Sequence, residues 1–333
     1  MDRRATLWLG VSSALALLAN KASSETADDA TRIYTESNEI VPLWLGTPPG
    51  GAGVAVKTKI VETSPTPELF HNRAAISVDV PFVAVYRPAA PSGSALLIIP
   101  GGGYTQELFD KEGLEPTRVF NQAGVTCFIL RYRLPTDGWA DRANVPLQDA
   151  QRAVRLIRAN ASKYGINPDR VGVIGFSAGG HLAASLATRH AAKVYEPVDA
   201  VDTHDAKPTV AGLMYPVITM GEGSHDDSRN ALLGNNLSPE AIAAYSCDKN
   251  VPANTPPSFI CFAADDNTVS PTRNGMAMYQ ALRATNIPSE MHVFEQGGHG
   301  FTVRNIAGKP AAAWPQLFLQ WSKSHGFRIA SPA

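Results

Sequence analysis

The sequence predicts an α/β fold in which a mostly parallel sheet is covered by helices on both faces. Continuous apolar runs of strand length alternate with stretches whose apolar residues recur every three or four positions. Hydrophobic residues make up 44% of the 333 residues, which is enough for one large core. The net charge is −1. This balance gives no electrostatic reason to expect a nucleic acid or an anionic membrane as a partner.

The first residues are typical of an export signal. Arg3 and Arg4 precede an uncharged apolar stretch at 5–19, and small polar residues follow it. This order predicts a signal peptide over 1–24, and the paired arginines resemble a twin-arginine signal. The apolar stretch is too short for a transmembrane helix. We therefore expect a periplasmic or extracellular protein with no integral membrane segment after signal removal. An amphipathic N-terminal arm is the alternative.

Two regions fall outside the regular alternation of strands and helices. Residues 25–75 are rich in Pro, Gly and Thr, which predicts an extended N-terminal segment with turns rather than a separate domain. The main domain is expected over 76–333. Within it, residues 218–256 are polar and lack strong apolar runs, so we expect a short lid-like insertion there.

The elements of the main domain follow in a regular order. Strand-length segments, most of them apolar, predict strands at 82–86, 95–99, 125–130, 171–176, 210–217, 258–263 and 289–294. Their alternation with helices predicts a mostly parallel sheet covered on both faces. Helical spacing predicts helices at 114–123, 145–160, 177–189, 272–284 and 312–325. The cysteines Cys127, Cys247 and Cys261 have no metal-ligand spacing, so neither a metal site nor a disulfide framework is predicted.

A G-x-S-x-G motif at 175–179 lies between a predicted strand and a predicted helix. Such a tight turn strains the backbone so that the serine hydroxyl projects above the sheet, and the glycines make room for the neighbouring strand and helix. Ser177 is therefore the predicted nucleophile. The N–H of Ala178 begins the helix, where the dipole favours developing negative charge. An ordinary glycine-rich turn with Ser177 as helix cap is the alternative.

Three glycines end an earlier strand in the sequence Pro100-Gly101-Gly102-Gly103-Tyr104. They leave backbone N–H groups unobstructed, so we expect Gly102 or Gly103 to join Ala178 in an oxyanion hole. A phosphate-binding loop would need Lys and Ser or Thr after the last glycine, and these are absent here. A plain flexible turn is the alternative.

A catalytic serine needs a base and a carboxylate that orients the base, and in this strand-turn-helix setting both follow it in the chain. His299 lies between glycines just past a predicted strand, where an imidazole can approach the serine. His225, in the insertion, is a second candidate for the base. Asp265 and Asp266 follow the strand at 258–263. One of them can point at His299 while the other caps the following turn.

Several segments together resemble the acetylxylan esterase and feruloyl esterase-like branch of the secreted α/β-hydrolases. They lie at 100–104, 131–134, 149–153, 175–181, 228–234 and 297–301, and the resemblance runs from about residue 80 to the C-terminus. In that branch the acid lies in a D-x-x-V pattern, which begins here at Asp266 and favours it over Asp265. The sequence departs from lipase-like relatives at Pro100, where they carry His, and this favours the esterase branch.

The resemblance implies a serine esterase without metal or cofactor. It implies hydrolysis of short acyl esters, above all acetyl, on a plant cell-wall polysaccharide or oligosaccharide. Tyr104, His225 and Phe301 are the expected substrate-binding residues. A feruloyl esterase or general carboxylesterase is an alternative, and an aromatic pocket for the former could include Trp139.

Two further alternatives come from other classes. A prolyl-oligopeptidase-type peptidase usually carries a large propeller, and the roughly 80 residues before the core are too few for blades of ~40–50 residues. A noncatalytic carbohydrate-binding protein on this scaffold usually lacks a triad member, whereas all three candidates are present here.

Overall fold

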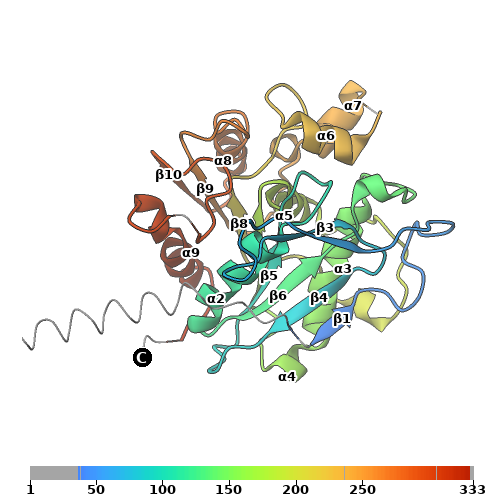
Figure 1. Ribbon diagram of the computed structural model, residues 1–333, viewed down its shortest axis with the longest axis horizontal. Coiled ribbons are helices and arrows are strands. Elements are labelled where there is room, and N and C mark those ends of the chain that lie inside the picture. Colours follow the sequence, from blue (N-terminus) through green and yellow to red (C-terminus); the bar gives the residue numbers. More distant parts are fainter. Residues whose placement is uncertain (1–36, 38, 236, 305, 331–333) are drawn as a thin grey trace, which may run out of the picture.

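The computed structural model describes residues 37, 39–235, 237–304 and 306–330. Within these residues the chain forms an eight-stranded sheet, which runs through the middle of the molecule (Figure 1). The strands, in spatial order, are β1 (Ile40–Pro42), β4 (Phe82–Tyr86), β6 (Thr126–Arg131), β5 (Ala95–Ile99), β7 (Val171–Phe176), β8 (Ala211–Met214), β9 (Ser258–Ala263) and β10 (Ser289–Phe294). The strands from β6 to β10 are parallel, whereas β4 pairs antiparallel with both β6 and β1.

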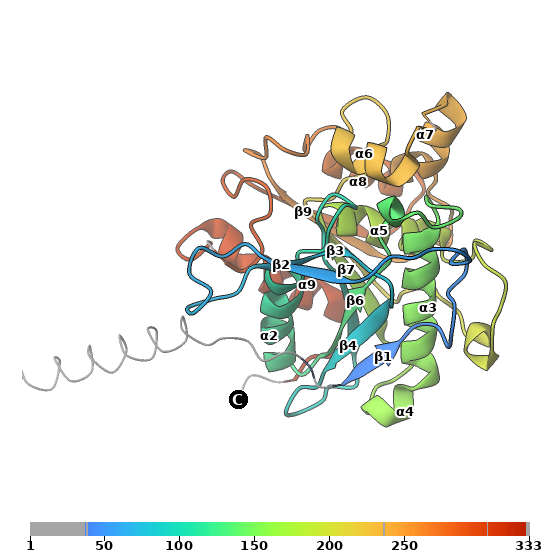
Figure 2. The ribbon, with the colours of Figure 1, turned by 45° about the vertical axis from the view of Figure 1, so that its right-hand side comes forward.

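Helices cover both faces of the sheet. One face carries α2 (Glu115–Gln122) and α9 (Trp314–Lys323), and the other carries α3 (Val145–Ala159), α5 (Ala178–Arg189) and α8 (Gly275–Ala284) (Figures 1 and 2). This arrangement confirms the prediction of a mostly parallel α/β sheet with helices on both faces. The other helical elements are η1 (Asp110–Leu114), η2 (Pro135–Asp137), α4 (Ala161–Tyr164), η3 (Ala200–Thr203), α6 (Asp226–Leu233), α7 (Pro239–Tyr245), η4 (Cys247–Lys249) and η5 (Pro310–Ala313).

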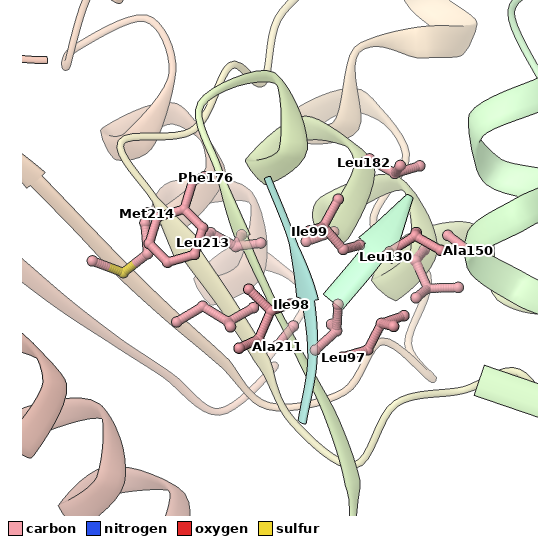
Figure 3. Packing of buried hydrophobic residues seen from close by; sticks show 14 of the residues in the cluster. Leu97, Ile98, Ile99, Leu130, Ala150, Phe176, Leu182, Ala211, Leu213 and Met214 are labelled. Atoms are coloured by element: carbon pink, nitrogen blue, oxygen red, sulfur yellow. The ribbon is translucent and has the colours of Figure 1, made fainter. Parts of the chain in front are cut away.

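The central strands are buried along their whole length, which explains their apolar sequences. Every residue of β5, β6, β7, β8 and β9 is buried, because helices pack on both sides of these strands. Leu97 and Ile99 of β5 lie on the side where Ala150 of α3 packs, and Ile98 points to the opposite side (Figure 3). The antiparallel strand β4 alternates between buried and half-buried residues instead.

The N-terminal segment, predicted over 25–75, is described from residue 37 onward, apart from residue 38. It adds β1 to the edge of the sheet and pairs β2 (Lys59–Glu62) with β3 (Arg73–Ser77) in a small antiparallel sheet. The predicted signal peptide at 1–24 lies outside the described residues. None of the described helices is both long and apolar enough to cross a membrane.

A buried ion pair attaches the N-terminal segment to the main domain. Arg133 and Asp149 are both fully buried, and the guanidinium Nη2 lies 2.7 Å from the Asp149 carboxylate. The same carboxylate accepts a hydrogen bond of 2.7 Å from the indole N–H of Trp44. The other guanidinium nitrogen, Nη1, donates to the carbonyl of Pro49 at 2.6 Å. Two positions of the segment therefore depend on one buried pair of charges.

Replacement of Asp149 by Ala is expected to lower the free energy of unfolding by about 3–5 kcal/mol, because it leaves the Arg133 charge buried without a partner. Urea denaturation monitored by tryptophan fluorescence measures this loss. The control is Glu222→Ala, which breaks an exposed pair with Arg273 and should cost under about 1 kcal/mol. Equal effects of the two substitutions would contradict this account of the buried pair.

Candidate active site

Ser177 lies at a strained turn between β7 and α5. Its φ is 53°, in the left-handed region that a residue with a side chain rarely adopts. The turn is tight because its flanking glycines have no room for a side chain. A Cβ on Gly175 would lie 2.1 Å from the carbonyl oxygen of Gly179, and a Cβ on Gly179 would lie 2.3 Å from that of Ile99. The predicted strand-turn-helix geometry is therefore present, and both glycines are sterically required.

The structure brings Ser177, His299 and Asp266 together. The Oγ of Ser177 lies 2.8 Å from Nε2 of His299, and Nδ1 of His299 lies 2.7 Å from Oδ2 of Asp266. With Asp266 ionised, Nδ1 carries the proton and donates it, which leaves Nε2 as the acceptor for the serine hydroxyl. A base within hydrogen-bonding distance of a hydroxyl, held by a buried carboxylate, is the arrangement that nucleophilic catalysis by serine requires.

Asp266 is 6% exposed, yet it is held in its charged form. Burial on its own raises the pKa of this carboxyl group. The hydrogen bond and charge of His299 outweigh that effect, together with the N–H groups of Val269 and Thr268, and lower the pKa below its ordinary value. A carboxylate that stays ionised can orient the imidazole and stabilise its protonated form.

Asp265 is exposed and has a different partner from the one we expected. Its Oδ1 accepts the N–H groups of Gly297 and Gly298 at 2.9 and 2.7 Å. The expectation that this carboxylate caps the following turn is wrong, because the second oxygen of Asp266 already accepts the N–H groups of that turn. Asp265 instead stabilises the glycine loop that carries His299.

The glycine loop after β5 lies beside the serine. A Cβ on Gly101 would lie 2.9 Å from the Cβ of Ser177. The N–H of Gly101 donates to Oε2 of Glu112 at 2.7 Å. By contrast, within the described part of the chain no acceptor is found for the N–H groups of Gly102, Gly103 and Ala178. Among the residues that the structure describes, the three donors predicted for an oxyanion hole thus have no acceptor.

Tyr104 was expected to bind substrate but is only 1% exposed. Its hydroxyl lies 2.8 Å from Nδ1 of His181, and Nε2 of His181 lies 2.8 Å from the carbonyl oxygen of Tyr245. A carbonyl oxygen only accepts, so Nε2 carries the proton and Nδ1 accepts from Tyr104. Burial lowers the pKa of His181 to about 4. Tyr104 therefore joins the glycine loop to the start of α5 and does not offer its ring to a ligand.

The other expected substrate contacts differ from one another. Phe301 is buried, with its ring centroid 5.0 Å from that of Tyr215. Trp139 is also buried, so neither ring forms an open aromatic surface. His225 is half-buried at the N-terminus of α6, in the insertion drawn at the top of Figure 2. Burial lowers its pKa. A Cβ on Gly103 would lie 3.8 Å from Oγ of Ser228 in the same helix, so the insertion approaches the glycine loop.

Two residues near the site were missed from the sequence. Glu112 bonds Gly101, and the hydroxyl of Tyr215 donates to the other oxygen of Glu112 at 3.0 Å. The Tyr215 ring lies 5.1 Å from the His299 ring, centroid to centroid. A single charged residue before a helix and a tyrosine after a strand carry no recognisable sequence signal.

The described residues contain no group of three or more His, Cys, Asp or Glu that could hold a metal ion. Cys127, Cys247 and Cys261 are buried free thiols.

Known proteins match most of this chain. The BD-FAE family matches residues 83–282. Endo-1,4-beta-xylanase B of Butyrivibrio fibrisolvens is 39% identical over 210 residues, which cover 63% of this chain and 33% of that protein. Acetylxylan esterase of Xylanibacter ruminicola is 34% identical over 220 residues, which cover 65% of this chain and 42% of that protein. The aligned part thus spans less than half the length of either curated relative.

A solved structure matches more completely. The acetyl ester-xyloside bifunctional hydrolase from Caldicellulosiruptor lactoaceticus superposes with a TM-score of 0.72 at 29% sequence identity. The superposition covers 88% of this chain and 98% of that one. The arrangement of strands and helices is therefore shared over nearly the whole of that protein.

The lowered pKa of His181 predicts a pH dependence of stability. In the unfolded chain the His181 imidazole takes up a proton near pH 6.5, whereas in the folded chain the same imidazole does so only near pH 4. The contribution of neutral His181 is therefore present above pH 6.5 and is lost as the pH falls towards 4. Over this window it should amount to on the order of 3 kcal/mol.

Urea denaturation of the wild-type protein and of His181→Gln at several pH values between 6.5 and 4 measures this effect. The variant should lose less stability than the wild type as the pH falls, because Gln does not titrate. The control is His204→Gln, at an exposed histidine, which should follow the wild-type profile. Parallel profiles for the wild type and His181→Gln would rule out this role for His181.

Proposed function

Because this chain belongs to the BD-FAE family and has the α/β-hydrolase fold, we propose that it is a serine esterase with Ser177, His299 and Asp266 as its catalytic triad. The observation that carries the proposal is the 2.8 Å hydrogen bond between the Ser177 hydroxyl and Nε2 of His299, at a turn whose backbone is strained. Homologues named acetylxylan esterase and ethyl acetate hydrolase support the same chemistry.

In the proposed reaction, Oγ of Ser177 attacks the ester carbonyl carbon while Nε2 of His299 takes the hydroxyl proton. The carbonyl oxygen becomes an oxyanion and accepts hydrogen bonds from Ala178 and from Gly102 or Gly103. Asp266 stabilises the imidazolium. The tetrahedral intermediate then collapses, and His299 passes its proton to the departing alcohol oxygen.

The second half of the reaction removes the acyl group from Ser177. Water loses a proton to Nε2 of His299 as its oxygen attacks the acyl carbon. The same N–H groups bind the second oxyanion. Its collapse returns the proton to Oγ of Ser177 and releases the carboxylic acid. All the proton transfers thus pass through His299.

We further propose that the ester is an acetyl group on a plant cell-wall polysaccharide or oligosaccharide. The name of the acetylxylan esterase relative supports this substrate, and the near-zero net charge suits a neutral polymer. The alternative of a feruloyl pocket is less well supported, because Tyr104, Phe301 and Trp139 are all buried. Because such polymers lie outside the cell, we also propose that the protein is exported by the signal peptide predicted over 1–24.

The proposed substrate is tested by incubation of the protein with acetylated xylan, acetylated pectin and methyl ferulate, with measurement of the acid released. We expect acetate release from acetylated xylan to be the fastest of the three reactions. Ser177→Ala should lower each rate by at least ~10³-fold without loss of the folded state, because the nucleophile is gone. A rate close to that of the wild type in this variant would refute the assignment of Ser177.

The two adjacent carboxylates should differ in their effect on catalysis. Asp266→Asn is expected to lower kcat for para-nitrophenyl acetate by about 10⁴-fold, because an amide favours the wrong tautomer of His299. Asp265→Asn is the matched control, since its amide oxygen can still accept from Gly297 or Gly298, and its loss should stay within about tenfold. The opposite order of the two losses would exchange the roles of these residues.

A further inference from the structure

Glu112 is a buried carboxyl group that the proposed reaction does not use. It lies in η1, a π-helical turn before α2, and is only 2% exposed. Burial raises its pKa, and the charge of Lys111 and the N–H of Gly101 oppose this rise. A carboxyl group is costly to bury, so its partners indicate why it is kept. Both of its hydrogen bonds inside the described chain go to the wall of the active site.

The first partner is the start of the oxyanion-binding loop. Oε2 of Glu112 accepts the N–H of Gly101, and Gly101 has no room for a side chain, since a Cβ would lie 2.4 Å from the carbonyl oxygen of Phe176. The next residues, Gly102 and Gly103, have φ values of 127° and 67°. Glycines have many accessible backbone conformations, so an external contact is needed to direct their N–H groups. Glu112 provides that contact at the first peptide of the loop.

The second partner leads to the base. Tyr215 follows β8 with a φ of 34°, and its hydroxyl donates to Oε1 of Glu112 at 3.0 Å. Its ring makes an edge-to-face contact with the His299 ring, at an interplanar angle of 69° and with centroids 5.1 Å apart. The tyrosine therefore supports the position of the imidazole. The hydrogen bond to Glu112 fixes the position of the Tyr215 ring. One carboxyl group therefore joins the oxyanion-binding loop to the support of the base.

We propose that Glu112 is a positioning residue of this esterase, which holds the Gly101 loop and the edge-to-face pair Tyr215–His299 in one geometry around Ser177. The inference rests on the proposed function. Glu112 has no contact with the reacting atoms and acts through Gly101 and Tyr215. The role requires a side chain of this length, because the carboxyl group has to contact both Gly101 and Tyr215. A neutral amide of the same length can still accept from Gly101 and donate to the Tyr215 oxygen.

Two substitutions separate the effect of side-chain length from that of charge. Glu112→Gln keeps the length of the side chain and removes its charge, whereas Glu112→Asp keeps the charge and withdraws the carboxyl group by about 1.5 Å. For para-nitrophenyl acetate we expect Glu112→Asp to lower kcat by about 10–100-fold with KM within about threefold, because displacements near 1 Å can cost on the order of 10²-fold in rate. Glu112→Gln should stay within about fivefold of the wild type.

The control is Asp110→Asn in the same turn. Asp110 is also buried, but its carboxylate bonds Arg73 and not the active site, so kcat should not change. Thermal unfolding establishes that each variant is folded. Equal losses in Glu112→Gln and Glu112→Asp, a larger loss in Glu112→Gln, or a wild-type kcat in Glu112→Asp would each overturn the proposal.

A third variant keeps the test decisive if Glu112→Asp does not fold. Tyr215→Phe retains the ring and removes the hydroxyl bonded to Glu112, and we expect kcat to fall by at least about threefold. An unchanged kcat in this variant overturns the proposal. The wild type is first tested for ester hydrolysis and for labelling of Ser177 by a fluorophosphonate. Failure of both would refute the proposed function, whereas an active wild type with insensitive variants refutes only the role of Glu112.

Discussion

The whole site depends on the close approach of backbone around Ser177. A serine with a φ of 53° is in an unfavourable conformation, which costs on the order of 1–3 kcal/mol. The conformation is maintained because Gly175 and Gly179 let the end of β7, the start of α5 and the end of β5 come together without side chains between them. The same contact puts the glycine loop after β5 alongside the serine. Close backbone packing thus fixes the position of the Ser177 hydroxyl and also brings the oxyanion donors next to it.

Polar side chains near the site fix loops that have no regular hydrogen-bonded structure. Glu112 accepts the N–H of Gly101, Asp265 accepts two N–H groups of the His299 loop, and His181 bonds the carbonyl of Tyr245. Each bond joins a side chain on one element to the backbone of another. Functional loops are more mobile than the sheet that supports them. These contacts hold the loops in place, as the backbone hydrogen bonds of the sheet hold its strands.

The central strands and the pair Ser177 and His299 could be predicted because their signals are local. A strand buried on both faces has an uninterrupted apolar sequence, and glycines flank residues that need close backbone approach. The edge strand β1 was not predicted because three residues are too few for a pattern. The burial of Tyr104 and Phe301 was not predicted either, since an aromatic residue has the same sequence signal inside a protein as on its surface. The role proposed for Glu112 could not be predicted either, because one of its two partners, Tyr215, lies 103 positions away in the chain.

The bond between His181 and Tyr245 limits how the insertion at 218–256 can diversify. Tyr245 ends α7 inside this insertion, and its carbonyl selects the proton position on an imidazole that in turn holds Tyr104. If another segment replaces this insertion, it has to place a hydrogen-bond acceptor where the Tyr245 carbonyl lies. Exchange of the insertion is therefore restricted where the chain passes α5.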